Sequence, residues 1–174
     1  MVVIEYDKKW PNDFLKIKKE LLTVLTVNSD IQHVGSTSIP GMKAKPIIDI
    51  DVGLENWDDF ERVKSELSTI GYDHEGDLGI KGREAFGRNG QVHNEVLDSI
   101  EHHLYVCSIN NEEFKRHILF RDYLRSHDEA RDKYNQIKEE ILEKVGADNR
   151  AGYVQMKEDE YKDFFEGIIK KAKL

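Results

Sequence analysis

The chain has 174 residues, of which 39% are hydrophobic and 34% charged, as expected for one folded globular domain. Its formal net charge of −8 argues against binding along the backbone of DNA or RNA, because such proteins present a basic surface. A single cysteine, Cys107, excludes an internal disulfide and favours a reducing compartment. We see no signal peptide and no run of 18 apolar residues, so we expect a cytoplasmic protein without a membrane span.

The first half of the sequence predicts alternating helices and strands. Apolar residues recur at helical spacing over residues 10–27, with Pro11 near the start. A short strand at 31–34 and a longer one at 46–54 follow. Residues 58–70 predict a second helix, after which Gly71 suits a left-handed cap.

Residues 72–108 contain three short apolar or alternating runs, which predict strands at 80–86, 92–97 and 103–107. The turn-like sequence GRNG at 87–90 predicts an antiparallel hairpin between the first two.

After Asn110 the spacing of apolar residues predicts three helices, at 114–125, 130–145 and 161–168. The fold class is therefore α+β. We expect one domain over 1–174, with a mixed core at about 1–109 and a helical segment at 110–174.

The segment at 33–54 carries the strongest chemical signal. Gly35 and Ser36 follow a strand, where a residue without a Cβ allows a tight turn and close approach to a phosphate. Asp49 and Asp51 share one face of the next strand, while Ile48, Ile50 and Val52 occupy the other. Two neighbouring carboxylates are costly to desolvate unless a cation compensates them.

These observations predict a Mg²⁺ site that holds a metal-bound nucleoside triphosphate, with Lys43 and Lys45 close by in the sequence. Taken singly, the Asp-x-Asp pair is also typical of a solvated strand face, and Gly-Ser of an ordinary turn.

A Gly-Ser turn followed by acid-hydrophobic-acid on a strand resembles the nucleotidyltransferase superfamily related to DNA polymerase β. The fuller string HVGSTSIPGMKAKPIIDIDV resembles the GrpB family, whose members have that fold. Further blocks resemble the family in the same order over nearly the whole chain: EYDKKWPNDF, KGREAF, EHHLYV, FRDYLR, ARDKYNQIKEE and YKDFF.

The resemblance implies that Gly35 and Ser36 contact phosphate and that Asp49 and Asp51 bind Mg²⁺ or Mn²⁺. Superfamily enzymes usually add a third acid from a neighbouring strand. Here the corresponding block reads His103-Leu104-Tyr105-Val106, where the family has His-Leu-His-Val, so no carboxylate is present.

His103 and Tyr105 share a strand face, and His103 is a candidate general base or a ligand for Zn²⁺, Mn²⁺ or Ni²⁺. The alternative interpretation is that His103 is a structural strand residue, hydrogen-bonded beneath a helix. Glu95 and Asp98, on the predicted strand nearby, are the fallback third carboxylates.

Several basic residues are further candidates. Arg83 suits bidentate contact with phosphate, with Lys81 as a second choice and a solvated charge as the alternative. Arg121 either joins the helical part to the sheet, with Asp122, or faces the nucleotide. We interpret Tyr134 and Lys138 mainly as a core tyrosine and a surface lysine, with a Lys138 that reaches the site as the lesser alternative. Residues 138–144 are interpreted as a solvated helix face.

Two functions compete on this evidence. The first is metal-dependent transfer of a nucleotidyl group from a nucleoside triphosphate to a small-molecule or protein hydroxyl. The second is a catalytically inactive nucleotide-binding or partner-binding module of the same fold. A link to coenzyme A metabolism rests on GrpB-like domains that occur beside dephospho-CoA kinase. The chain itself has no G-x-x-x-x-G-K-[ST] loop and is not expected to be such a kinase.

Overall fold

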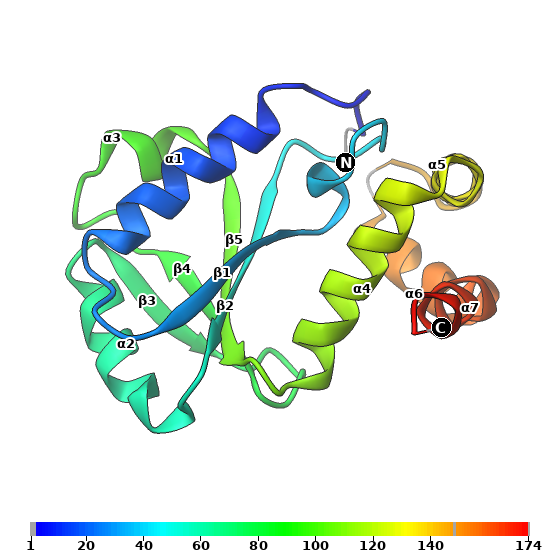
Figure 1. The fold of residues 1–174 in the computed structure, drawn as a ribbon. Helices are drawn as coiled ribbons and strands as arrows, with labels where there is room; N and C mark the ends of the chain where they lie inside the picture. Colours follow the sequence, from blue (N-terminus) through cyan, green and yellow to red (C-terminus); the bar gives the residue numbers. More distant parts are fainter. Residues whose placement is uncertain (1–2, 148, 174) are drawn as a thin grey trace.

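The structure is a computed structural model that describes residues 3–147 and 149–173, with a mixed sheet and helices on both of its faces (Figure 1). In chain order the elements are α1 (Trp10–Leu22), β1 (Ser29–Val34), the 3₁₀ turn η1 (Ser36–Ser38), β2 (Ile48–Leu54), the 3₁₀ turn η2 (Trp57–Asp59), α2 (Phe60–Ser68), β3 (Tyr72–Gly76), β4 (Arg83–Arg88), α3 (Glu95–Ser99), β5 (His102–Ser108), α4 (Glu112–Ser126), α5 (Asp128–Val145), α6 (Arg150–Glu160) and α7 (Lys162–Ala172).

The sheet has five strands in the order β1-β2-β5-β4-β3. Strands β2 and β5 run parallel, and the other three pairs are antiparallel. The long connection between β2 and β5 contains α2, β3, β4 and α3, as a parallel pair requires a crossover. The predicted α+β class is confirmed.

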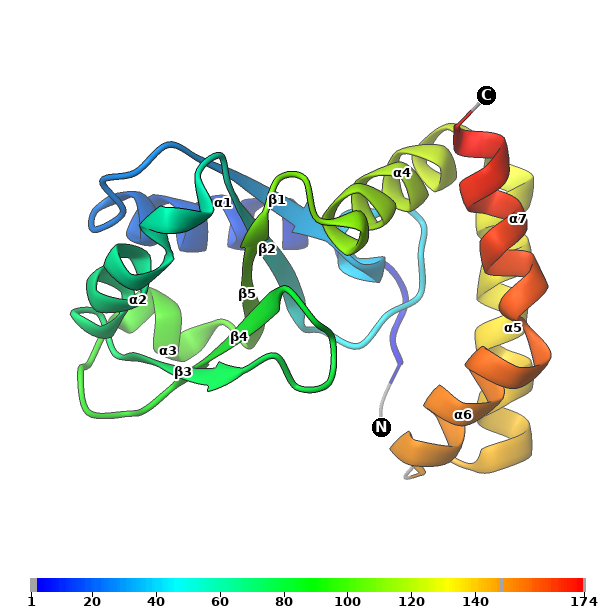
Figure 2. The ribbon, with the colours of Figure 1, turned by 90° about the horizontal axis from the view of Figure 1, so that it is seen from below.

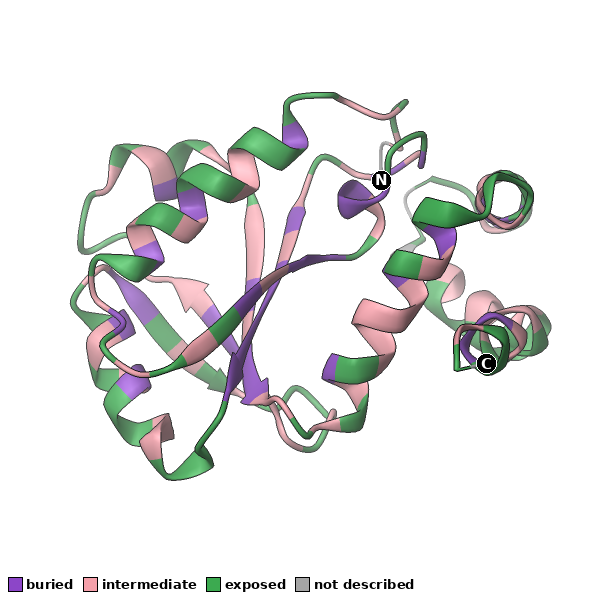
Figure 3. Cartoon of the chain, viewed as in Figure 1, coloured by how far each residue is buried: buried purple, intermediate pink, exposed green. Residues whose placement is uncertain are grey.

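One face of the sheet is the main hydrophobic core. Ile48, Ile50 and Val52 are buried there with residues of α1 and α2, as the alternation along β2 predicts. Figure 3 shows that buried residues follow β1 and β2 and the inward sides of the helices. A second, smaller core lies among α4, α5, α7 and the segment that follows η1, around Leu124 and Ile141.

The other face of the sheet is covered by α4, and α5, α6 and α7 form a layer beyond it (Figure 2). Gly53 lets α4 approach, because a Cβ at that position would lie 2.6 Å from Phe114 Cζ. Arg121 fixes the same helix to β1 by donating to Gln32 Oε1 at 2.6 Å and to the His33 carbonyl at 2.9 Å. Arg121 thus joins the helical part to the sheet, while its ion pair with Asp122 stays within α4.

Two predicted elements are wrong. Residues 92–97 are not a strand, because Asn94 caps a short helix, α3, by accepting a bond from the Leu97 amide. The hairpin predicted around GRNG is replaced by one between β3 and β4, whose connection holds two glycines with positive φ, Gly79 and Gly82. The C-terminal part has four helices instead of three, since α6 precedes the predicted segment at 161–168.

Within the described residues, no helix combines the length and apolar character needed to cross a membrane.

Candidate functional site

The turn after β1 brings backbone against a carboxylate. Gly35 has a φ of 70°, which favours glycine, and it leads into η1 with Ser36 as the first residue. A Cβ at Gly35 would lie 2.3 Å from Asp49 Oδ2. The absence of a side chain therefore lets the Gly-Ser turn and Asp49 lie in direct contact.

Asp49 and Asp51 lie side by side on the sheet face that looks toward α4. Asp49 pairs with Val34 on β1 and with His103 on β5, and Asp51 pairs with Tyr105. His103 Nδ1 lies 2.9 Å from Asp49 Oδ1. Because a carboxylate oxygen accepts, this nitrogen donates, and Nε2 of the neutral imidazole keeps its lone pair.

Asp51 is the most enclosed charge of the site. Its exposed fraction is 0%, and His117 from α4 donates from Nδ1 to Asp51 Oδ2 at 2.6 Å. The second oxygen, Oδ1, is buried and has no hydrogen-bond partner among the described residues. A buried carboxylate oxygen without a donor is costly, so this atom indicates a missing cation or donor.

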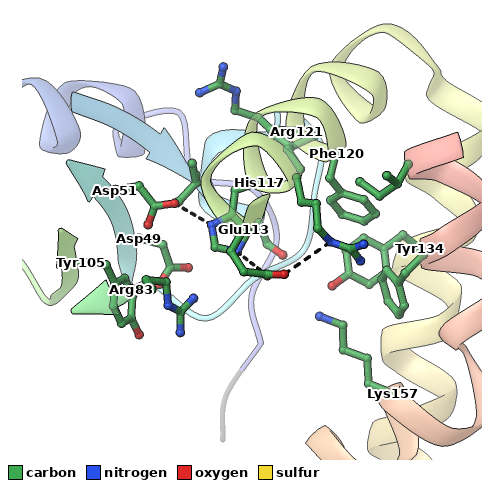
Figure 4. Close-up of a pocket in the computed structure, with 17 residues that line it drawn as sticks. Asp49, Asp51, Arg83, Tyr105, Glu113, His117, Phe120, Arg121, Tyr134 and Lys157 are labelled. Atoms are coloured by element: carbon green, nitrogen blue, oxygen red, sulfur yellow. Dashed lines mark hydrogen bonds and ion pairs between the residues drawn. The ribbon is translucent and has the colours of Figure 1, made fainter. Parts of the chain in front are cut away.

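A cavity of about 370 Å³ opens between this sheet face and the helices (Figure 4). Gly35, Ser36, Asp49 and Asp51 form part of its wall. The remaining lining comes from Val34, Ile39, Arg83, Tyr105, Glu113, Arg116, His117, Phe120, Arg121, Tyr134, Lys157, Phe165 and Ile169. The sheet and α4 thus supply most charges, while Tyr105 of β5 and residues of α4, α5 and α7 supply the aromatic rings.

A second cavity of about 320 Å³ shares Ser36, Asp49, Tyr134 and Lys157 with the first. Its wall includes Lys45, Lys138 and Lys157. Three lysines around one small volume form a positive region within an acidic protein, which favours an anion such as phosphate.

Lys138 is buried, so the interpretation as a surface lysine is wrong. Its Nζ donates to Ser36 Oγ at 2.7 Å and to the Lys43 carbonyl at 2.5 Å, across 102 and 95 residues of sequence. Burial lowers the pKa of Lys138 to about 8, although the neighbouring Tyr134 and Asp49 favour its charged form. Burial opposes ionisation of Tyr134 as well, but the ammonium groups of Lys157 and Lys138 outweigh it and lower the Tyr134 pKa.

The sequence candidates divide between the two cavities. Arg83 lines the first, with its guanidinium carbon 4.0 Å from the centre of the Tyr105 ring. Lys45 and His103 line the second. Lys43 instead pairs with Glu5 and Glu139, and Lys81 is exposed and lines neither cavity.

Glu95 and Asp98 are wrong as fallback carboxylates, because both lie on α3 and line neither cavity. Asp98 is held there by an ion pair with Arg88 and by the Asn94 amide.

His117, Glu113 and Lys157 are site residues that the sequence predictions missed. Glu113, His117 and Arg121 are spaced four residues apart and share one face of α4, a pattern that is visible in the sequence. His117 Nε2 lies 4.0 Å from Glu113 Oε2, so the imidazole stands between Glu113 and Asp51. Lys157 lies on α6, which was not predicted.

The donor set partly fits a hard divalent cation. Within 3–147 and 149–173, no three or more His, Cys, Asp or Glu side chains are grouped to hold a metal ion. Asp49 and Asp51 supply two carboxylates on one face, and Asp51 Oδ1 is free to bind. Mg²⁺ is commonly bound by one or two carboxylates together with substrate phosphates and water, so two protein ligands suffice only when a nucleotide is present.

Comparison with known proteins identifies relatives along the whole chain. A family model described as GrpB protein matches residues 1–171. The glutamate-rich protein GrpB of Alkalihalophilus pseudofirmus is 33% identical over 87% of this chain and 86% of its own length. The UPF0157 protein YqkA of Bacillus subtilis is 32% identical over 90% of this chain, which spans only 44% of that longer protein.

A solved structure is similar to this chain over nearly its whole length. The crystal structure of the conserved protein GrpB from Enterococcus faecalis superposes with a TM-score of 0.79 and 28% identity, over 98% of both chains. The family model and the Alkalihalophilus relative together show that the chain belongs to the GrpB family.

Proposed function

We propose that the protein binds a nucleoside triphosphate with a divalent cation in the cavity beside β2 and transfers its nucleotidyl group to a hydroxyl acceptor. The observation that carries this proposal is the buried Asp51, with one oxygen unpaired, on the same strand face as Asp49. Gly35 and Ser36 lie against this pair, where a phosphate meets backbone without a side chain in the way.

The terminal phosphates belong at the Ser36 end of the site. Ser36 lines both cavities and accepts a hydrogen bond from Lys138. Lys45 and Lys157 line the cavity next to it. Positive side chains held in a partly buried pocket stabilise phosphate more strongly than the same charges do in open solvent.

A divalent cation bound by Asp49 and Asp51 would neutralise negative charge on the phosphates and orient them. His103 and His117 fix the two carboxylates by donating from Nδ1. In the transfer step the acceptor oxygen bonds to the α-phosphorus, and the bond to pyrophosphate breaks with its electron pair on the leaving group. The hydroxyl proton passes to Nε2 of His117, which lines the same cavity, with His103 as the second candidate.

One observation favours a second function, nucleotide binding without transfer. The strand beside β2 presents His103 and Tyr105 opposite the aspartates, and neither is the third carboxylate that the superfamily usually has. With two protein carboxylates the site is suited to hold one cation, whereas two-metal transfer sites place a second cation on the attacking oxygen.

Isothermal titration calorimetry with ATP, GTP, CTP and UTP, each with Mg²⁺ or Mn²⁺, tests the site. We expect metal-dependent binding of one or more nucleotides by the wild type. Asp49→Asn and Asp51→Asn should each weaken it by about tenfold or more, because each removes a charged ligand. Asp73→Asn, on the far edge strand β3, is the matched control and should bind like the wild type.

Pyrophosphate release in the presence of hydroxyl acceptors separates the two functions. Release that requires Asp51 supports transfer. Tight binding with no release across a broad panel of acceptors supports nucleotide binding without transfer. The absence of any metal-dependent nucleotide binding by the wild type would exclude both.

A further inference from the structure

Two buried side-chain atoms lack a hydrogen-bond partner among the described residues, and both belong to one cavity. They are Asp51 Oδ1, which calls for a cation or a donor, and Arg83 Nε, which calls for an acceptor. None of the ion pairs within the described part of the chain involves Arg83, although Asp51 and Glu113 line the same cavity. The ligand of this cavity must therefore present an anionic or strongly accepting group to Arg83.

The strand register places the aspartates between the Gly-Ser turn and Arg83. Val34, which precedes the turn, pairs with Asp49 at one end of β2. Arg83 pairs with Cys107, and Cys107 pairs with Gly53 at the other end. The backbone positions of Asp49 and Gly53 are therefore separated by about 13 Å along the strand, at a rise of about 3.3 Å per residue.

Transfer at phosphorus constrains where the acceptor binds. The attacking and leaving oxygens lie roughly in line with the α-phosphorus. If pyrophosphate leaves toward Ser36 and Lys138, the attacking hydroxyl enters from the opposite side of the aspartates. The Arg83 backbone lies on that side, and its side chain extends from there along the cavity wall to the Tyr105 ring beside Asp51.

We propose that Arg83 recognises an anionic group on the acceptor, so that the acceptor is a small hydroxyl compound carrying a carboxylate or a phosphate. This inference rests on the proposed nucleotidyl transfer. The guanidinium stacks on the Tyr105 ring, and Tyr105 pairs with Asp51. The planar fork of guanidinium N–H groups is therefore held beside the aspartates. A planar fork binds carboxylate or phosphate through two parallel hydrogen bonds. Its position next to Asp51 requires the anion to lie within a few bonds of the reacting hydroxyl.

Three probes that share a glycerol skeleton test this assignment. Glycerol has no charge, glycerate carries a carboxylate and glycerol 3-phosphate carries a phosphate. Binding is measured by saturation-transfer NMR at millimolar probe concentration, with Mg²⁺ and a non-hydrolysable analogue of the nucleotide that binds, and again without nucleotide. The proteins are the wild type, Arg83→Gln, Arg83→Lys, and Arg62→Gln as an exposed control on α2.

We expect at least one anionic probe, but not glycerol, to bind the wild type and the Arg62→Gln control. The preferred probe shows whether the group is a carboxylate or a phosphate. Arg83→Gln should weaken that binding by about tenfold or more, because a charge-assisted pair is lost. The probe affinity of Arg83→Lys should lie between those of the wild type and Arg83→Gln, because lysine keeps the charge but lacks the planar N–H groups. Nucleotide affinity should change little in either Arg83 variant.

Several results would overturn the inference. They are equal binding of glycerol, no binding of either anion, or anion binding that Arg83→Gln leaves intact. A loss of nucleotide affinity in Arg83→Gln as large as in Asp51→Asn would assign Arg83 to the nucleotide phosphates instead. These failures leave the proposed function standing. A wild type that binds no nucleotide overturns the function, and the acceptor assignment with it.

Discussion

At the residue scale, the contact between Gly35 and Asp49 predicts how much stability is lost when Gly35 gains a side chain. Gly35→Ala should lower the free energy of unfolding by about 2–4 kcal/mol, because a methyl group adds backbone strain at positive φ and overlaps a carboxylate. The added Cβ would lie 2.3 Å from Asp49 Oδ2. Urea unfolding measures the change, and nucleotide calorimetry shows whether the displaced carboxylate still binds.

Gly90 provides the matched control. Its φ of 69° is almost that of Gly35, and a Cβ there would meet nothing within 4 Å. Gly90→Ala should therefore cost only the strain, about 1 kcal/mol. Equal losses in the two variants would show that Asp49 moves aside freely and that the Gly35 contact does not hold the site together.

The residues of the site differ in how well local pattern predicts them. Asp49 and Asp51 follow from strand alternation, because Ile48, Ile50 and Val52 define the apolar face of β2. The buried position of Lys138 does not follow from local pattern. A lysine on an amphipathic helix is normally solvated, and the partner of Lys138, Ser36, lies 102 residues away. His117 meets Asp51 across 66 residues, so only the tertiary fold reveals their hydrogen bond.

At the element scale, the start of α4 decides where His117 lies. Asn111 caps this helix, with Oδ1 accepting from the Glu113 and Phe114 amides at 2.8 and 3.3 Å. Its Nδ2 also donates to the Gly82 carbonyl at 3.2 Å, next to β4. One side chain therefore fixes α4 relative to the strand that carries Arg83.

Replacing this cap separates its two roles. Asn111→Ala should lower the unfolding free energy by about 1–2 kcal/mol, since both the cap and the bond to Gly82 are lost. Asn111→Asp keeps the cap and loses only the donor, so it should cost about half as much. The control Asn149→Ala removes a cap that serves α6 alone. Thermal and urea unfolding measure all three, and equal costs for Ala and Asp would show that the cap contributes nothing.

Strong periodicity predicted most elements, and the failures have local causes. The α1, α2, α4 and α5 helices and the β1, β2 and β5 strands all lie where apolar spacing indicated. The pattern over α3 predicts a strand because its few apolar residues do not reveal a helical period, although Asn94 is a favoured capping residue. GRNG resembles a hairpin turn, but a strand chooses its partner through tertiary contacts that two glycines cannot specify.

At the scale of the whole molecule, the site lies between two layers with separate cores. The sheet with α1–α3 encloses one core, and α4–α7 with the segment that follows η1 enclose the other. The order of predicted strands and helices indicates the α+β class, whereas the strand order within the sheet and the position of α6 required the structure. The net charge of −8 also gave no hint that Lys45, Lys138 and Lys157 gather at one cavity.

Stability of the whole chain should depend on pH through a histidine buried between β1 and α1. His33 is 6% exposed, stacks on Phe14 of α1 and hydrogen-bonds Thr37 of η1 at 3.0 Å. Burial, helped by the positive charge of Arg125, lowers the His33 pKa to about 4. Thr37 donates to the Ile47 carbonyl, so its hydroxyl oxygen accepts from His33 Nε2, and burial keeps the ring neutral near pH 7.

The unfolded chain binds a proton at this histidine near pH 6.5, well above the folded value, so acid favours unfolding. The contribution is fully present above about pH 6.5 and is lost as pH falls toward 4, by about 3 kcal/mol. Burial also lowers the His102 pKa, which adds a change of the same sign. Urea unfolding from about pH 7 to about pH 4 should show a shallower fall for His33→Gln, whose amide keeps the donor, than for the wild type. His93→Gln, with an exposed side chain, is the control. If His33→Gln lost stability as steeply as the wild type, the acid sensitivity would arise elsewhere, and His33 would not be the group that links protonation to unfolding.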